Sequence, residues 1–257
     1  MESIRTRQRC VVLSRNPGTA PLRLVVSRLD NMAWAFTNYF YRLEEARQHL
    51  NNSPDQSLKI FSKESHNSKR QFSAISSRDF WDAYQTIREV DRNYYEIILE
   101  EESCKLYLDI DISRTENTGF TIEEGNHLVQ SFIEEVLTPG CEQLLENDFD
   151  LTEEDILWLD SSSERKFSVH LVVPKLVFSS NQVVKIFLET LCHSLSQEHQ
   201  ERFTFNEKLM VDTKCYSRNQ NFRILHSSKF GKNSHLRVGD QNKFPLPRAL
   251  SCLRPVW

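Results

Sequence analysis

Hydrophobic and polar residues alternate along the segment CKLYLDIDIS, residues 104–113. Because successive side chains of a strand point to opposite faces, this alternation predicts a β-strand with one buried face. The buried face would carry Leu106, Leu108, Ile110 and Ile112, and the opposite face Tyr107, Asp109, Asp111 and Ser113. Side chains two positions apart on one face are about 6–7 Å apart at the backbone, so the two carboxylates repel each other. A divalent cation bound between them would remove that repulsion.

A second segment, KFSVHLVV at residues 166–173, alternates in the same way. One face would carry Phe167, Val169, Leu171 and Val173, and the other Lys166, Ser168 and His170. A cation, a hydroxyl and an imidazole in one row form a donor array of the kind that binds a chain of phosphates. A strand with one solvent-exposed face would show the same pattern, so this segment alone leaves both interpretations open.

Helices are predicted where apolar residues recur every three or four positions. They cover residues 36–50, 76–87, 122–137 and 181–195, and the third should end at TPGC, residues 138–141. Further strands are predicted near the end of 62–77, at both ends of 94–113, at 208–213 and at 221–228. Strands interleaved with helices, without a regular strand–helix–strand rhythm, predict the α+β class.

Composition excludes several classes of protein. The chain has 257 residues, 39% hydrophobic and 26% charged, as expected for one globular domain or two small ones. Its apolar runs are too short to span a membrane. Six cysteines without C-x-x-C spacing indicate reduced thiols in an intracellular compartment and no structural zinc site. Six glycines and neither glycine-rich nucleotide motif mean that any phosphate must be held by side chains and metal.

Positive charge is local, since the net charge of the chain is −4. Asp212 follows an apolar run, and no acid occurs from Thr213 to Arg237. The bases in that stretch are Lys214, Arg218, Arg223, Lys229, Lys232 and Arg237. Phosphates or a nucleic-acid backbone would be attracted there, although a solvated basic face would look the same. The first 28 residues also hold six arginines and one acid, typical of either a mitochondrial presequence or a disordered basic tail.

Three aspartates, a K-x-S-x-H row and a basic segment together fit nucleotidyl transfer. In this chemistry carboxylates hold two divalent cations about 3.5–4 Å apart, one activating the attacking hydroxyl and the other neutralising the triphosphate. Oxygen ligands favour Mg²⁺ or Mn²⁺ over zinc. Cationic side chains would stabilise the transferring phosphoryl group in place of a glycine-rich loop.

The motifs CKLYLDID, DSSSERKFSVHLVV and VDTKCYSRNQNFRILHSSKFGK resemble, in order and spacing, the three motifs of the archaeo-eukaryotic primase superfamily. They most resemble its eukaryotic primase-polymerases, and the resemblance covers about residues 36–245. It implies a primase-type catalytic core with mixed or antiparallel sheets and flanking helices. It also implies a DNA-directed primase-polymerase that acts in damage tolerance and replication restart.

The resemblance implies a role for each matching residue. Asp109, Asp111 and Asp212 would be the catalytic carboxylates that bind two Mn²⁺ or Mg²⁺ ions. The incoming nucleotide would be bound by Lys166, Ser168, His170, Arg223, Lys229 and Tyr95, with Tyr95 near the sugar. DNA would be bound by Arg70, near the templating base, and by Arg218 and Lys232.

The implied partners are a DNA template-primer, deoxynucleoside and ribonucleoside triphosphates, and a single-stranded-DNA-binding protein reached through regions outside this chain. No membrane is implied. The implied locations are the nucleus and the mitochondrial matrix.

The implied organisation is a basic segment at 1–35, an N-terminal module at 36–103, a catalytic module at 104–245 and a divergent tail at 246–257. The chain departs from the family where D-x-D replaces D-x-E in the first motif, and where Gln220 replaces a basic residue expected to contact DNA. It also lacks the zinc module that the family uses for primer initiation. We therefore expect no zinc, and primer extension rather than unprimed synthesis, with even extension in question if strands of the core are missing.

Two other functions remain open from the sequence. A metal-dependent nuclease needs the same carboxylates but has no use for a triphosphate-binding row. A catalytically impaired relative would bind DNA in a salt-dependent way without depending on Asp109.

Overall fold

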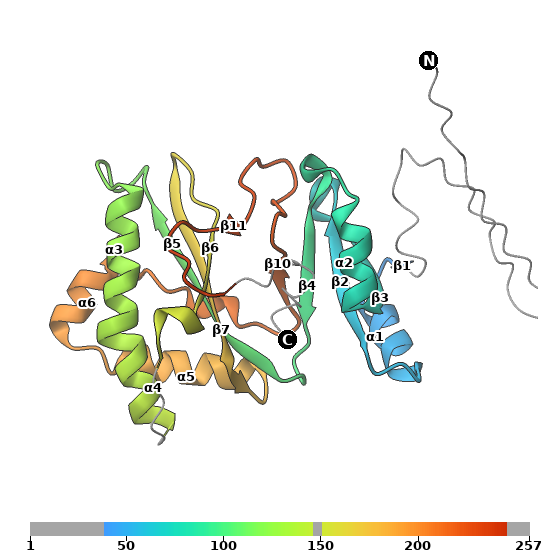
Figure 1. Cartoon of the computed structure of the whole chain (residues 1–257), viewed down its shortest axis with the longest axis horizontal. Helices are drawn as coiled ribbons and strands as arrows, with labels where there is room; N and C mark the ends of the chain where they lie inside the picture. Colours follow the sequence, from blue (N-terminus) through green and yellow to red (C-terminus); the bar gives the residue numbers. More distant parts are fainter. Residues whose placement is uncertain (1–38, 146–150, 246–257) are drawn as a thin grey trace, which may run out of the picture.

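A computed structural model describes residues 39–145 and 151–245 as two antiparallel sheets that lie side by side with helices on their outer sides. Figure 1 shows α3, α4 and α6 beyond one sheet and α1 and α2 beyond the other. Every strand pair is antiparallel. The predicted α+β architecture, with antiparallel sheets and flanking helices, is therefore confirmed. The predicted basic segment at 1–35 and the predicted tail at 246–257 lie outside the described residues.

The first sheet has the strand order β1-β3-β2-β4-β10. Its strands are β1 (Tyr39–Phe40), β2 (Leu58–Glu64), β3 (Arg70–Ser76), β4 (Tyr94–Ile98) and β10 (Gln220–Arg223). The last strand comes from the third motif and pairs with β4, with Arg223 opposite Tyr95. A strand from the end of the described chain thus completes a sheet that begins near residue 39.

The second sheet has the order β11-β6-β7-β5. Its strands are β5 (Cys104–Ser113), β6 (Leu157–Asp160), β7 (Lys166–Phe178) and β11 (Arg237–Val238). The predicted alternation in β5 is confirmed, since Leu106, Leu108 and Ile110 are fully buried while Asp109 and Asp111 are partly exposed. A separate hairpin consists of β8 (Thr204–Phe205) and β9 (Lys208–Leu209).

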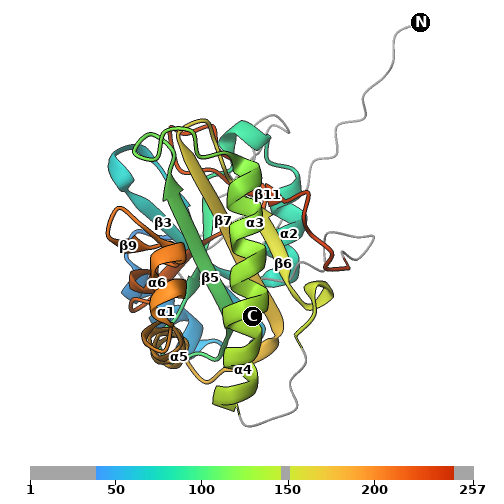
Figure 2. The same ribbon diagram turned by 90° about the vertical axis from the view of Figure 1, so that its left-hand side faces the viewer.

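Side-chain caps begin α2 and α3. In α2 (Ser77–Gln85), the side chain of Ser76 accepts the Asp79 N–H, and in α3 (Ile122–Phe132), Thr121 and Glu124 form a capping box. The other helices are α1 (Leu43–Asn52), α4 (Thr138–Leu145), α5 (Asn181–His193) and α6 (Gln197–Phe203). Figure 2 shows α3 lying along β5 and β7. There it covers the apolar face of both strands, and Val129 and Phe132 join their core.

Several predicted boundaries were wrong. The helix predicted from residue 36 begins at Leu43, after the strand Tyr39–Phe40, which pairs with β3. The segment TPGC does not end the third helix: a π-helical turn at Ile133–Leu137 leads into α4, which contains it. Pro139, which lacks the N–H that a regular helix would use, is the second residue of α4 and so lies just after this π-helical turn, and the backbone stays helical from α3 into α4.

The predicted strands at 208–213 and 221–228 are shorter in the structure, covering Lys208–Leu209 and Gln220–Arg223. The sequence interpretation missed β2, β6 and α6, and also the two-residue strands β1, β8 and β11. No helix of the described residues is long and apolar enough to cross a membrane.

Buried aromatic contacts join the two sheets. The Tyr107 ring of β5 lies 5.0 Å from the Phe222 ring of β10 and 4.9 Å from the Tyr216 ring. The hydroxyl of Tyr216 donates to the carbonyl of Tyr107 at 2.5 Å. These contacts fix the polar face of β5 against the third motif and its strand, which places the candidate site between the sheets.

Candidate active site

The register of β5 and β7 places the first two motifs opposite each other. Asp109 pairs with His170, and Asp111 pairs with Ser168. Residues directly opposite in an antiparallel pair have Cα atoms about 4.5–5.5 Å apart, and their side chains share one face. The acidic pair and the donor row of the sequence therefore form one surface.

Backbone hydrogen bonds bring the third aspartate to the other side of β5. The N–H of Asp212 donates to the carbonyl of Asp109 at 2.8 Å, and the N–H of Asp111 donates to the carbonyl of Met210 at 3.0 Å. Between them Ile110 and Val211 form an antiparallel bridge. Although Asp109 and Asp212 are 103 positions apart in sequence, the bridge makes their backbones neighbours.

This crowding perturbs the protonation of Asp109. Its side chain is 26% exposed, but Oδ1 is inaccessible and accepts no hydrogen bond from any described residue. Burial and the Asp111 carboxylate, with Asp212, raise the pKa of Asp109 to about 7, although Lys166 and Arg223 oppose the change. The site therefore concentrates more negative charge than its own cations balance.

His170 is neutral. Burial, and then the positive charge of Arg223, lower the pKa of His170 to about 3. Its Nε2 lies 3.5 Å from Oδ1 of Asp109, which is the spacing of a loose ion pair. Since the imidazole carries no charge, we interpret this contact as a neutral ring held beside a carboxyl group. Nδ1 of His170 is also buried and has no hydrogen-bond partner among the described residues.

A divalent cation fits the unsatisfied oxygens of this site. Oδ1 of Asp109 and Oδ1 of Asp111 are both buried without a hydrogen-bond partner in the part of the chain that the structure describes. Asp111 turns its other oxygen to the Lys166 amine at 2.5 Å, and Asp212 accepts the Lys214 N–H at 2.8 Å. Consequently no group of three or more His, Cys, Asp or Glu side chains within 39–145 and 151–245 is already arranged to hold a metal. The donor chemistry suits a cation that binds oxygen.

The donor row beside the carboxylates is held by short hydrogen bonds. Ser168 receives the hydroxyl hydrogen of Ser161 at 3.1 Å, and its N–H donates to Oγ of Ser162 at 3.0 Å. Arg223 is 8% exposed; it donates through Nη1 to the carbonyl of Ser234 at 3.3 Å, and its buried Nε has no described partner. Ser168 and His170 lie opposite the aspartates and the charge of Arg223 acts on Asp109, so polar and cationic groups adjoin the carboxylates.

A second cluster surrounds Tyr95 on the first sheet. The Tyr95 hydroxyl donates to Oε2 of Glu64 at 2.7 Å, and the Arg70 guanidinium lies 5.0 Å from the centre of the Tyr95 ring. The N–H of Phe230 donates to the same Glu64 oxygen at 3.0 Å. This N–H belongs to a tight turn in which the N–H of Lys232 donates to the carbonyl of Lys229, with Gly231 at a φ of 71°.

Curated proteins similar to this chain carry one name, DNA-directed primase/polymerase protein. The protein from Danio rerio is 31% identical over 229 residues, which cover 74% of this chain and 42% of the relative. The protein from Mus musculus is 27% identical (69% and 41%), and that from Homo sapiens is 28% identical (65% and 41%). Over the matched residues, the chain is similar to these primase-polymerases. It spans about two fifths of the length of these relatives, and no family model matches it.

Most residues that the primase-polymerase resemblance singles out lie in the two clusters. Asp109, Asp111, Lys166, Ser168 and His170 share the face formed by β5 and β7. Arg223 connects this face with the Tyr95 cluster, since its charge affects the pKa of Asp109, His170 and Tyr95.

One predicted DNA contact, Arg218, lies apart from the candidate site. Its side chain is 79% exposed and pairs at 2.9 Å with Glu100, which follows the Ile98 end of β4. Gln220, where the family resemblance led us to expect a basic residue, accepts a hydrogen bond from Ser217 and pairs with Ile98 at that end. That Arg218 contacts DNA stays a prediction.

Glu64 is a residue of the Tyr95 cluster that the sequence interpretation missed. It ends β2 and binds groups from β3, β4 and the turn at 229–232, with a side chain only 13% exposed. Burial alone would raise the pKa of Glu64, but hydrogen bonds from Phe230 and Tyr95, with the charges of Arg70 and Lys229, hold it below its usual range. A single acid in a polar segment gives no signal in sequence, because its partners lie in three other segments.

Replacement of Asp109 by asparagine should stabilise the metal-free protein at alkaline pH. Because the folded-state pKa lies above that of the unfolded chain, the wild-type protein loses stability as pH rises between about 4 and 7. Asp109→Asn lacks this loss. In EDTA its midpoint of thermal unfolding should exceed that of wild type by about 2–8 °C at pH 8 and match it at pH 4. An equal difference at both pH values would contradict the assignment.

Removal of the Glu64 carboxylate should loosen the turn at 229–232. Glu64→Ala leaves the Tyr95 hydroxyl and the Phe230 N–H without their acceptor, so the free energy of unfolding should fall by about 2 kcal/mol. Amide hydrogen exchange of residues 229–232 should also become faster. Glu100→Ala, which breaks the exposed pair with Arg218, is the matched control and should change stability by less than about 0.5 kcal/mol. Unchanged exchange in Glu64→Ala would refute the anchoring role.

Proposed function

We propose that this chain carries the catalytic core of a DNA-directed primase-polymerase and performs template-dependent nucleotidyl transfer. The observation that carries the proposal is the convergence of Asp109, Asp111 and Asp212 beside the row of Ser168 and His170. The names of the similar proteins support the same chemistry. A primase-type fold of the archaeo-eukaryotic superfamily is part of the proposal.

Asp109, Asp111 and Asp212 would hold two Mg²⁺ or Mn²⁺ ions. When bound, such ions lower the pKa of an attacking hydroxyl and neutralise charge on a triphosphate. Cation binding would also satisfy the buried oxygens of Asp109 and Asp111.

Side chains of the protein would bind the triphosphate directly. Ser168 and His170 would bind the phosphates of the incoming nucleotide, and neutral His170 would do so as a hydrogen-bond donor. Lys166 lies on Asp111 at 2.5 Å, at the border between the carboxylates and the donor row, so its charge is placed to act on either. Arg223 on β10 and Lys229 in the turn at 229–232 would add positive charge, because both act on His170.

The Tyr95 cluster is suited to the nucleoside end of the substrate. Tyr95 would contact the sugar, and Arg70, which lies over its ring, would approach the templating base. Template-primer DNA and deoxynucleoside or ribonucleoside triphosphates are the proposed substrates, with Arg218 and Lys232 as further DNA contacts. Action in damage tolerance, in the nucleus and mitochondrial matrix, follows from the resemblance alone.

A nuclease would use the same carboxylates, and the donor row argues against it. Ser168 and His170 are 5% and 6% exposed and are placed opposite the aspartates, as binding of a triphosphate requires. A nuclease needs only the phosphate that it cleaves. The assay below separates the two activities, because extension lengthens a labelled primer and cleavage shortens it.

Asp212→Ala should abolish extension of a primed DNA template in Mn²⁺ and in Mg²⁺. Asp212 is partly exposed on a backbone fixed by its own N–H, so the variant should unfold as wild type does. Primer extension on a denaturing gel is the measurement, with far-UV circular dichroism as the folding check. Asp155→Ala, which removes a carboxylate paired with Lys175 at 2.6 Å outside the site, is the control and should extend normally. Extension retained by Asp212→Ala would remove its metal-binding role, and shortening of the primer by wild type would indicate a nuclease.

A further inference from the structure

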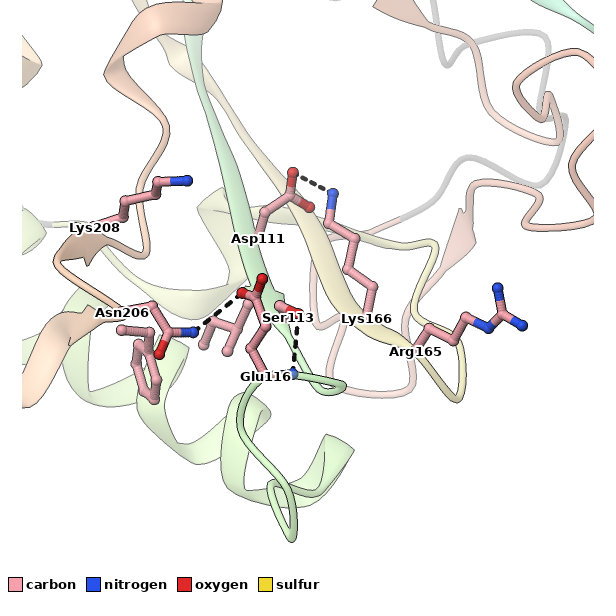
Figure 3. Close-up of a pocket in the computed structure, with 9 residues that line it drawn as sticks. Asp111, Ser113, Glu116, Arg165, Lys166, Asn206 and Lys208 are labelled. Atoms are coloured by element: carbon pink, nitrogen blue, oxygen red, sulfur yellow. Dashed lines mark hydrogen bonds and ion pairs between the residues drawn. The ribbon is translucent and has the colours of Figure 1, made fainter.

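A cavity of about 310 Å³ lies beside the carboxylates. Its polar wall comes from Asp111, Ser113, Glu116, Arg165, Lys166, Asn206 and Lys208, and its apolar wall from Ile112 and Phe205. Figure 3 shows Lys208 extending toward the strand that carries Asp111, whereas the guanidinium of Arg165 points away. Lys208 and Phe205 come from the β8–β9 hairpin, which neither the motifs nor the proposed mechanism uses.

The acids of this cavity already have partners. Asp111 binds the Lys166 amine at 2.5 Å, and Glu116 accepts a hydrogen bond from the Asn206 amide at 3.2 Å. The Lys208 amine, in contrast, makes no hydrogen bond or ion pair with any residue that the structure describes. A free cation on the wall of a cavity favours an anionic ligand.

The hairpin holds Lys208 in a defined place. Asn206 and Glu207 have φ values of 49° and 62°, the left-handed conformation that a two-residue type I′ turn requires. Thr204 pairs with Leu209, and Phe205 pairs with Lys208. The Asn206–Glu116 hydrogen bond joins the turn to the loop after β5. The position of Lys208 is thus set by backbone geometry rather than by a flexible loop.

Lys208 and the proposed phosphate-binding residues Ser168 and His170 lie at opposite edges of β5. β7, with Ser168 and His170, pairs with one edge of β5, and the segment Met210–Asp212 bonds to its other edge. Lys208 lies two residues before that segment. In an in-line displacement the attacking and leaving oxygens lie on opposite sides of the transferred phosphorus. If the triphosphate lies over β7, the attacking primer terminus approaches from the edge that carries Lys208.

We propose that this cavity binds the end of the primer strand and that Lys208 contacts its last internucleotide phosphate. Phe205 and Ile112 would contact the terminal sugar, so that the 3′-hydroxyl lies near Asp111. The inference rests on the proposed function. It adds a primer subsite and assigns Lys208 as a positioning residue that does not touch the reacting atoms.

The contact between Lys208 and the last internucleotide phosphate is tested by removing each charge singly and both together. One primer carries a neutral methylphosphonate in its last internucleotide linkage, and a second carries it far upstream. Each is annealed to a template, and the dissociation constant is measured by fluorescence anisotropy for wild type, Lys208→Ala and Lys208→Arg. Lys185→Ala is the control variant, because Lys185 is on α5 and pairs with Glu189 at 3.7 Å.

Lys208→Ala should weaken binding of the unmodified primer-template on the order of fivefold and reduce the salt slope by about 0.9. The terminal methylphosphonate should weaken primer-template binding by wild type by a similar factor. It should not further weaken binding by Lys208→Ala. The upstream methylphosphonate should affect both proteins equally. Lys208→Arg should retain wild-type binding, and Lys185→Ala should bind as wild type does.

Equal weakening of wild type and Lys208→Ala by the terminal methylphosphonate would overturn the proposal. So would a Lys208→Ala variant that binds primer-template normally but needs more nucleotide for extension, since Lys208 would then act on the triphosphate. Loss of extension by wild type, with the coupling in binding intact, would reject the proposed polymerase activity and retain the DNA subsite.

Discussion

The site depends on two backbone hydrogen bonds that join β5 to the segment before the third motif. The N–H of Asp212 binds the carbonyl of Asp109, and the N–H of Asp111 binds the carbonyl of Met210. Without this bridge the third carboxylate would have no fixed relation to the first two. Tyr107, which lies on the polar face of β5, reinforces the arrangement by packing on Tyr216 and Phe222 on either side of the third motif's turn. Chain segments that are far apart in sequence are thereby held as one surface.

The arrangement is stable only because positive groups surround it. Three carboxylates meet where burial already disfavours negative charge, and both effects raise the pKa of Asp109. Lys166 lies on Asp111, and Arg223 acts on both Asp109 and His170 from the other sheet. Although the net charge of the chain is −4, Lys166 and Arg223 place positive charge beside this partly buried acidic cluster. A cation and an anionic substrate are the ligands that such a balance accommodates best.

The sequence predicted the two strands of the site and the side chains on their polar faces. It did not predict the register of the strands or the tertiary contacts around them. Alternation placed Asp109 and Asp111 on one face of β5 and His170 on one face of β7, because the apolar side chains of each strand share the opposite face. Register could not be predicted, since the pairing of Asp109 with His170 depends on strands 61 positions apart. The helix through Pro139 was missed because a π-helical turn precedes it, and local propensity does not encode such a turn. Glu64 and Lys208 were missed because their partners, or their lack of one, are set by tertiary structure alone.

Binding of a nucleotide that cannot react tests the central claim most directly. Isothermal titration calorimetry with a non-hydrolysable deoxynucleoside triphosphate should detect tight binding in Mn²⁺, and binding weaker by at least about tenfold in EDTA. Asp109→Ala in Mn²⁺ should bind as weakly as wild type does in EDTA. Equal affinity in all three conditions would mean that the converging carboxylates do not form a metal site for nucleotides, and would contradict the account.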